Sequence, residues 1–334
     1  NFIATTLPQH KSKLHELKIK LMHTFQMGEC EPDLFLGIRI IRNRSERKVW
    51  LLQDVYIANM AAKYDLDHIT KISIPLPITY GKLPDSTDLS SNNSNGPPHL
   101  IHEYQSKVGS IGHAAIFTRP DVAKSYSLLA ESLTNPTQDD LTHANRCIQY
   151  LYSTRYRGIL YHGEKGCVEV FNGASDAAFA DDSQTRRSSE AYLFRLFGGP
   201  IAWAAKKQPT VAKSTMESEL AALSRVGSHY KWWERFFRSV HFNPEQDTVL
   251  YCDNTAAVDI ATSRTDKVAT KLRHTDVHQN WLRQETNRLW LDIRYIPTAN
   301  MPADGLTKIL CPQKHQHFLK QLNLEDVEYL ISKE

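Results

Sequence analysis

The chain has 334 residues, enough for two or three domains, and its hydrophobic content of 41% is that of an ordinary globular protein. No stretch approaches the run of about 18 apolar residues that a membrane span needs, and the first residues lack the basic and apolar blocks of a secretory signal. The 40 basic and 37 acidic residues nearly cancel, so the net charge excludes no class of partner.

The first half of the chain contains predicted helices on either side of two predicted strands. Apolar residues three and four positions apart predict helices at 11–27, 54–64, 104–134 and 137–153. The segments LFLGIRIIR (34–42) and KVWLLQ (48–53) predict strands. Residues 75–99 are rich in Pro, Ser, Asn and Gly, which predicts a linker or a long loop.

From Cys167 onwards, the pattern changes to alternating strands and helices. Strands are predicted from 168–171 and at 192–197, 201–205, 248–252 and 289–295. The second and third of these form a predicted hairpin across Gly198-Gly199-Pro200. Helices are predicted at 214–237, at 255–262, around 275–286 and from 302–308. This order predicts an α/β domain with a mixed sheet flanked by helices.

Helix 214–237 contains two carboxylates in different surroundings. Its apolar stripe consists of Met216, Leu220, Leu223, Val226, Tyr230, Trp233 and Phe237. At about 100° per residue, Glu219 falls near the centre of this stripe and Glu217 roughly 140° away from it. A carboxylate among core-facing residues is costly unless it is paired or binds a metal, so we expect a functional role for Glu219. Glu217 has a structural explanation, because Ser214 and Glu217 have the spacing of a capping box.

Three aspartates in the same part of the chain each have an ordinary structural explanation. Asp253 ends an apolar strand and could cap the following helix, although Asn254 could do so instead. Asp304 lies in the first turn of a helix, where the helix dipole favours an acid. Asp176 could be an ordinary turn residue. Taken singly, none of the three identifies a site.

Taken together, the four carboxylates indicate a metal site. Asp176, Glu219, Asp253 and Asp304 fall in one predicted α/β domain, three of them at strand or helix ends. Carboxylates that converge without cationic partners repel one another, and a divalent cation relieves that repulsion. Mg²⁺ prefers oxygen ligands. Two such ions about 4 Å apart can hold the attacking and leaving oxygens of a phosphoryl displacement.

Two stretches are candidates for phosphate binding. Residues 202–216 contain Lys206, Lys207 and Lys213 but no acid, and residues 264–288 contain six Lys or Arg and two His against three acids. Such patches could hold the phosphates of a nucleic acid. A solvated charged face explains the same charges, and composition alone does not decide between the two.

Six segments in the second half of the chain share their order and spacing with a known family. They are SDAAFADD, RRSSEAYLF, GGPIAWAAKKQPTVAKSTMESELAALS, LYCDNTAAV, KLRHTDVHQNWLRQE and YIPTANMPADGLTK. Residues 168–310 thereby resemble the ribonuclease H domain of copia-class retrotransposons. The resemblance implies endonucleolytic hydrolysis of RNA in an RNA–DNA hybrid, with two Mg²⁺ or Mn²⁺ ions. Its catalytic residues and metal ligands would be Asp176, Glu219, Asp253 and Asp304.

The same resemblance suggests which residues contact the nucleic acid. The candidates are Lys206, Lys207, Lys213, Asn254, Arg273 and His274, although His274 could equally be a plain surface residue. Ribonucleases H often carry a His in the loop before the last acid. Here that loop, 297–300, has none, so we assign no proton shuttle to His274 or His278.

The first half of the chain resembles the reverse transcriptase of the same polyprotein after its catalytic turn. The matching segments are FQMGECEPDLFLGIRI, LLQDVYIANMAAKYDL, YQSKVGSIGHAAIFTRPDVAKSYSLL and NPTQDDLTHANRCIQYLYSTRYRGILY. The family's polymerase acids lie in a Tyr-x-Asp-Asp turn, which would come just before Asn1. The 334 residues do not contain that turn, so we expect no DNA polymerisation by this chain.

The expected architecture is a ribonuclease H-like mixed five-stranded sheet with flanking helices, preceded by an α+β reverse-transcriptase remnant. The expected domains are 1–78 (end of palm and thumb), 79–103 (flexible linker), 104–166 (helical thumb or connection), 167–310 (ribonuclease H) and 311–334 (tail). Because the first residue is Asn rather than Met, we expect a fragment or a processed piece.

The leading hypothesis is a ribonuclease H module whose partners are an RNA–DNA hybrid and, where present, the rest of the polyprotein. Two alternatives stay open: a decayed or domesticated fragment that binds nucleic acid without cutting it, and a two-metal nuclease of the same fold that acts on DNA. The five scattered cysteines argue against a zinc site or a disulfide framework and fit a reducing compartment. We therefore expect a cytoplasmic (virus-like particle) or nuclear protein that is not secreted.

Overall fold

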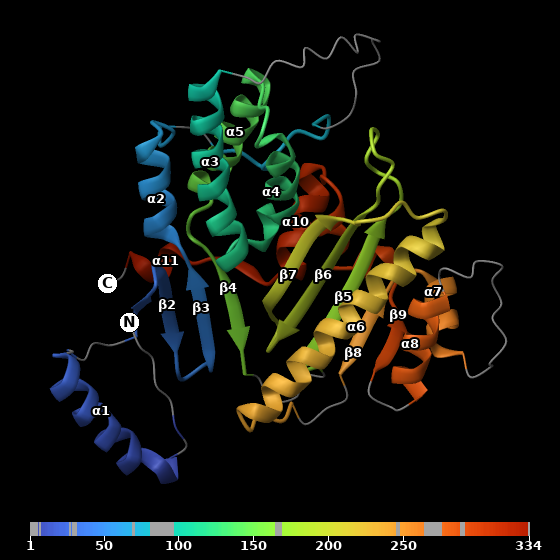
Figure 1. The fold of residues 1–334 in the computed structure, drawn as a ribbon. Coiled ribbons are helices and arrows are strands. Elements are labelled where there is room, and N and C mark those ends of the chain that lie inside the picture. Colours follow the sequence, from blue (N-terminus) through green and yellow to red (C-terminus); the bar gives the residue numbers. More distant parts are fainter. Residues whose placement is uncertain are drawn as a thin grey trace.

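The computed structural model describes residues 6, 8–26, 28, 32–68, 71–80, 97–163, 169–244, 248–263, 276–287 and 291–332. Their strands form two five-stranded sheets, in the orders β1-β2-β3-β4-β10 and β7-β6-β5-β8-β9 (Figure 1). The core of the predicted linker, 81–96, and the first two residues of the predicted strand 289–295 lie outside the described residues.

The first sheet is antiparallel throughout. Its strands are β1 (Leu34–Phe35), β2 (Ile38–Asn43), β3 (Lys48–Leu52), β4 (Arg157–His162) and β10 (Leu324–Asp326). The sequence predicted β2 and β3 but neither β4 nor β10. Since β10 has only three residues, it has too little alternation to be recognised, and it is a strand because it pairs with β4. The tail 311–334 therefore completes the first sheet.

Helices pack on the first sheet around a core of their own (Figure 1). They are α2 (Asp54–Lys63), α3 (Pro98–Phe117), α4 (Ala123–Leu129) and α5 (Gln138–Ser153). The prediction of one helix over 104–134 was wrong, because α3 ends at Phe117 and a 3₁₀ helix, Pro120–Val122, follows. Pro120 has no N–H and disfavours helical backbone in the residue before it. The preceding α1 (Lys11–Phe25) has no buried residue.

The second sheet is mixed, as predicted. Strands β5 (Phe171–Ala178), β6 (Ser189–Leu196) and β7 (Gly199–Lys207) are antiparallel, and β8 (Val249–Cys252) and β9 (Asp292–Tyr295) run parallel to β5. The predicted hairpin is confirmed. Its turn consists of Phe197 and Gly198, both with positive φ (51° and 80°), which is the backbone of a tight turn whose twist matches that of the strands.

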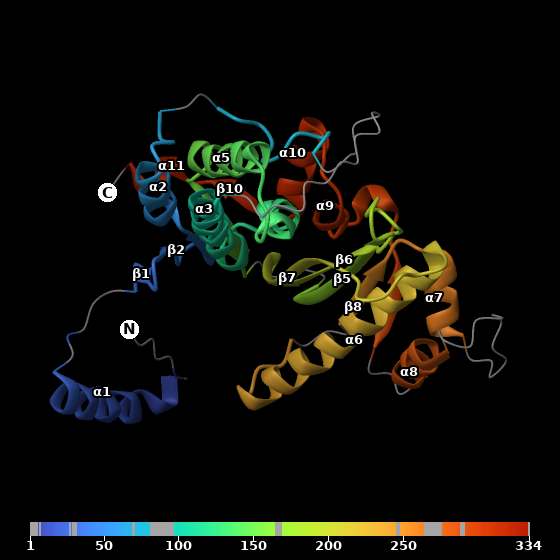
Figure 2. The same cartoon turned by 45° about the horizontal axis from the view of Figure 1, so that its top comes forward.

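Helices cover both faces of the second sheet (Figure 2). One face carries α6 (Thr215–Ser239), with α7 (Thr255–Thr262) and α8 (Asp276–Asn287) beside it; the other carries α9 (Asp304–Thr307) and α10 (Pro312–Gln321). Strand β6 shows the alternation that this requires. Phe194 belongs to the core under α6, whereas Ala191 and Leu193 belong to the core under α9 and α10.

Buried polar contacts join the two halves. The Trp203 indole donates to the backbone oxygen of Ala115 (2.7 Å), and the Tyr150 hydroxyl lies 2.7 Å from Nε2 of His315 in α10. After α10 the chain continues through β10 into α11 (Glu328–Ile331), beside the first sheet. Among the helices that the structure describes, none combines the length and the hydropathy needed to cross a bilayer.

Candidate metal centre

Two of the four predicted acids are adjacent because of strand register. In the parallel pair β5–β8, Ser175 lies opposite Cys252, so Asp176 and Asp253 each follow the same registered pair. The carboxyl ends of parallel strands meet at one edge of a sheet, which brings the two side chains together. Asp176 lies within β5, paired with Ala191, and is only 2% exposed, so it is not a turn residue.

Glu219 faces the sheet from the first turns of α6, as its place in the apolar stripe predicted. It is buried, and within the described residues its Oε2 atom has no hydrogen-bond partner. Burial, followed by the charges of Asp176 and Asp253, raises the pKa of Glu219 to about 9. A buried carboxylate oxygen without a donor is expensive, and a cation would compensate for it.

Asp176, Glu219 and Asp253 form an acidic triad, in which Asp176 and Glu219 are buried and Asp253 is half-buried. One carboxylate oxygen from each lies within 4.8 Å of the others. Burial raises the pKa of Asp176 to about 6, and the charges of Asp253 and Asp304 act in the same direction. The opposing influences are a hydrogen bond that the Thr307 hydroxyl donates to Asp176 and the charge of Lys308. The triad thus holds more negative charge than its surroundings neutralise.

Asp304 lies beside the triad but outside the 4.8 Å group. It begins α9, and its carboxylate forms an ion pair with the Lys308 ammonium group four residues later. Our expectation that the acids lack cationic partners was therefore wrong for this one. The signal for this ion pair in the sequence is the four-residue spacing of Asp304 and Lys308, which places the two side chains on one face of a helix.

Local capping leaves Asp253 available to the site. Asn254, not Asp253, is the N-cap of α7, and its Oδ1 accepts from the Ala257 amide at 3.0 Å. The Asp253 carboxylate instead accepts a hydrogen bond from the Thr298 hydroxyl at 2.8 Å. The structural explanation for Asp253 that the sequence left open is thereby removed.

Glu217 has a structural role at the start of α6. The Ser214 hydroxyl accepts from the Glu217 amide at 3.1 Å, which is half of the predicted capping box. The Glu217 carboxylate accepts from the amide of Lys213 at 2.8 Å, one residue before the cap. Glu217 is not part of the acidic triad.

The predicted nucleic-acid contacts differ in how accessible they are. Lys206 is half exposed, and its ammonium group lies 3.7 Å from the Glu190 carboxylate. Although residues 202–216 contain no acid, acids from other segments lie beside them, and Lys207 forms ion pairs with Glu131 and Asp182. Lys213 is exposed. The Asn254 side chain caps α7. Arg273 and His274 lie outside the described residues.

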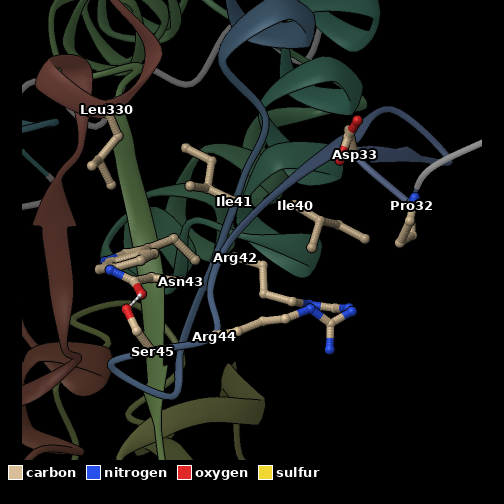
Figure 3. Close-up of a pocket in the computed structure, with 10 residues that line it drawn as sticks. Pro32, Asp33, Ile40, Ile41, Arg42, Asn43, Arg44, Ser45 and Leu330 are labelled. Atoms are coloured by element: carbon tan, nitrogen blue, oxygen red, sulfur yellow. Dashed lines mark hydrogen bonds between the residues drawn. The ribbon is translucent and has the colours of Figure 1, made fainter. Parts of the chain in front are cut away.

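A pocket of about 520 Å³ lies well away from these acids, along β2 and Leu330 of α11 (Figure 3). The Arg42 and Arg44 side chains extend to the same side of the strand there, and the Ser45 hydroxyl donates to Asn43 at 2.7 Å. The residues that line this pocket include no carboxylate cluster, so the chemistry that the sequence predicted belongs to the triad.

No protein-family model matches the chain. It is similar to "Retrovirus-related Pol polyprotein from transposon TNT 1-94" of Nicotiana tabacum, with 30% identity over 317 residues, which is 93% of this chain and 23% of that protein. It is also 26% identical over 315 residues to the corresponding protein from transposon RE1 of Arabidopsis thaliana (94% of this chain, 20% of that protein). The chain thus spans about a quarter or less of the length of these relatives.

Solved structures to which part of the chain is similar include LC11-RNase H1 in complex with an RNA/DNA hybrid, with 12% identity and a TM-score of 0.31 over 42% of this chain and 96% of that one. Another is the foamy viral protease-reverse transcriptase in complex with an RNA/DNA hybrid, with 13% identity and a TM-score of 0.45 over 89% of this chain and 34% of that one. The second sheet, with its antiparallel and then parallel strands, is the predicted mixed five-stranded sheet.

Proposed function

Because this chain matches a region of copia-type retrotransposon Pol polyproteins over most of its length, we propose that it is the ribonuclease H module of such a polyprotein. Its reaction would be the metal-dependent endonucleolytic hydrolysis of RNA in RNA–DNA hybrids. The observation that carries the proposal is the acidic triad, in which three carboxylates lie within 4.8 Å of one another. Repulsion between the three carboxylates would destabilise the folded protein, so folding alone does not explain the cluster.

The donor set fits a divalent magnesium or manganese site. Every ligand atom is a carboxylate oxygen, the kind that these ions prefer, and Glu219 offers an oxygen that has no other partner among the described residues. Asp176, Glu219 and Asp253 would hold the metal, and Asp304 would join them after giving up its ion pair with Lys308. When bound, a pair of such ions supplies the positive charge that stabilises the phosphoryl transition state.

The residues around the triad orient the carboxylates. The Thr307 hydroxyl donates to one oxygen of Asp176, and the Thr298 hydroxyl donates to one oxygen of Asp253. Each bond leaves the second oxygen of that carboxylate for a metal. Such supporting bonds keep ligands in place and are expensive to remove.

We assign residues 167–310 to the nuclease and propose that the preceding segment is a polymerase remnant that helps to hold the hybrid. The alternative is a fragment that binds nucleic acid without cutting it. Such a fragment would have the same fold and would differ from the proposed nuclease only in not hydrolysing the RNA.

The test is cleavage of an end-labelled RNA–DNA hybrid in Mg²⁺, by the wild type and by Asp253→Asn. We expect cleavage by the wild type and its loss in the variant. The matched control is Asp259→Asn, an exposed acid on α7 that lies outside the triad. A folded wild type that leaves the RNA intact would refute the proposal, and salt-dependent hybrid binding without turnover would favour the binding fragment. Faster cleavage of a DNA duplex would point to a DNA nuclease.

A further inference from the structure

Two aromatic side chains near the C-terminal end of α6 face solvent. Trp232 is 56% exposed and Phe236 is 41% exposed, and their rings are parallel within 4° with centroids 5.5 Å apart. Other rings of the same helix, such as Phe237, pack into the core below. Figure 2 shows this end of α6 extending beyond the strands that it covers. The stability of the sheet therefore does not explain the exposed pair.

The same face of α6 carries one arginine without an acidic partner among the described residues. Arg235, one turn from Trp232, is exposed, and its side chain makes no hydrogen bond or ion pair with any residue that the structure describes. The other Lys and Arg residues of 225–242 are already paired with acids: Arg225 with Glu190, Lys231 with Glu285 at 2.6 Å and Arg238 with Glu234 at 2.8 Å. The unpaired charge beside the two rings is therefore that of Arg235.

We infer that Trp232, Arg235 and Phe236, here called the aromatic–arginine face, bind single-stranded nucleic acid. Every base has an aromatic face, so stacking on exposed rings holds a strand of any sequence, and an arginine beside the rings attracts its phosphates. An exposed guanidinium in the middle of the face also argues against an apolar protein partner, since burying it unpaired would be costly.

The position of the face suggests which strand it binds, and this part of the inference rests on the proposed nuclease function. Trp232 follows Glu219 by thirteen residues on one helix, which corresponds to about 20 Å at 1.5 Å per residue. At about 3.4 Å per nucleotide, that is roughly six nucleotides along a strand. The face would hold the single strand that continues beyond a hybrid held at the triad.

The test measures binding separately from cleavage. The fluorescence anisotropy of labelled single-stranded DNA and RNA 12-mers is titrated with the full chain in EDTA. We expect Trp232→Ala and Phe236→Ala each to weaken binding about tenfold and Trp232→Phe to retain most of it, because a ring remains. Arg235→Gln should lower the slope of log Kd against log salt by about 0.7. Tyr329→Ala is the control, since Tyr329 is also 56% exposed but lies on α11.

The outcomes separate the inference from the proposed function. Loss of 12-mer binding in the two alanine variants, with Tyr329→Ala binding like the wild type, supports the aromatic–arginine face whether or not the wild type cleaves a hybrid. Binding that is unchanged in a folded Trp232→Ala, Phe236→Ala double variant overturns it. So does a double variant that loses only self-association in sedimentation experiments, because the face would then be a protein interface.

Discussion

Replacing Glu219 by Gln should stabilise the metal-free protein at neutral pH, although it removes a proposed metal ligand. The folded state raises the pKa of Glu219 from 4.5 to about 9, because burial and two neighbouring carboxylates disfavour its charge. Between these values the folded protein binds a proton that the unfolded chain has released, so stability falls as pH rises. Each pH unit is worth about 1.4 kcal/mol, and the loss of unfolding free energy from pH 4.5 to pH 7 is therefore at most about 3.5 kcal/mol.

The amide introduced by Glu219→Gln would stay neutral and would not contribute this slope. Urea denaturation in EDTA at pH 5, 6, 7 and 8 should show the difference in unfolding free energy between Glu219→Gln and the wild type growing with pH. Adding Mg²⁺ at pH 7 should stabilise the wild type more than the variant, because the ion binds the ionised carboxylate. Glu217→Gln, outside the triad, should retain the wild-type pH dependence. If the unfolding free energies of the wild type and Glu219→Gln instead changed in parallel with pH, the Glu219 carboxylate would not be held in its protonated form.

Three further changes have expected outcomes. Lys308→Met should lower the Mg²⁺ concentration at half-saturation in calorimetric titrations, since the ammonium group now competes for Asp304; a higher concentration would contradict this. Arg119→Met should reduce the unfolding free energy by about 3–5 kcal/mol in urea, because Asp121 would be left buried and unpaired, and a loss below about 1 kcal/mol would be inconsistent with this. Gly173→Ala should cost about 1–3 kcal/mol in the same assay, since its Cβ would clash with Leu250 and lie 2.9 Å from Phe194; a neutral change would mean that both side chains can move away.

Much of the second half could be predicted because its signals are local. The apolar stripe of α6 identified both the helix and the inward-facing Glu219, and the glycine-rich turn identified the β6–β7 hairpin. The convergence of the acids could not be predicted from local signals. Asp176 and Asp253 meet because Ser175 and Cys252 are in register, and register between distant strands depends on the whole packed sheet. Without the resemblance to a known family, the sequence offered four separate candidates rather than a cluster.

The first half was harder to predict because several of its elements depend on distant partners. A helical pattern over 104–134 continued through Pro120, whose effect on the backbone ends the helix. Strand β4 follows α5 after a short turn, and its neighbours in the sheet are β3, which comes before α2, and β10, which comes after the second sheet. Pairings of that kind leave little trace in local composition.

The pairing of β10 with β4 has a consequence for how the chain folds as it is synthesised. The β4 edge at Arg157–His162 leaves the ribosome long before Leu324–Asp326, its neighbour in the sheet. The first sheet must therefore wait, with one edge unpaired, until all of the second sheet has emerged. Ending the polypeptide at residue 310 would leave that edge permanently open, and an open edge invites association with other strands. The two halves are thus successive in sequence but are completed together.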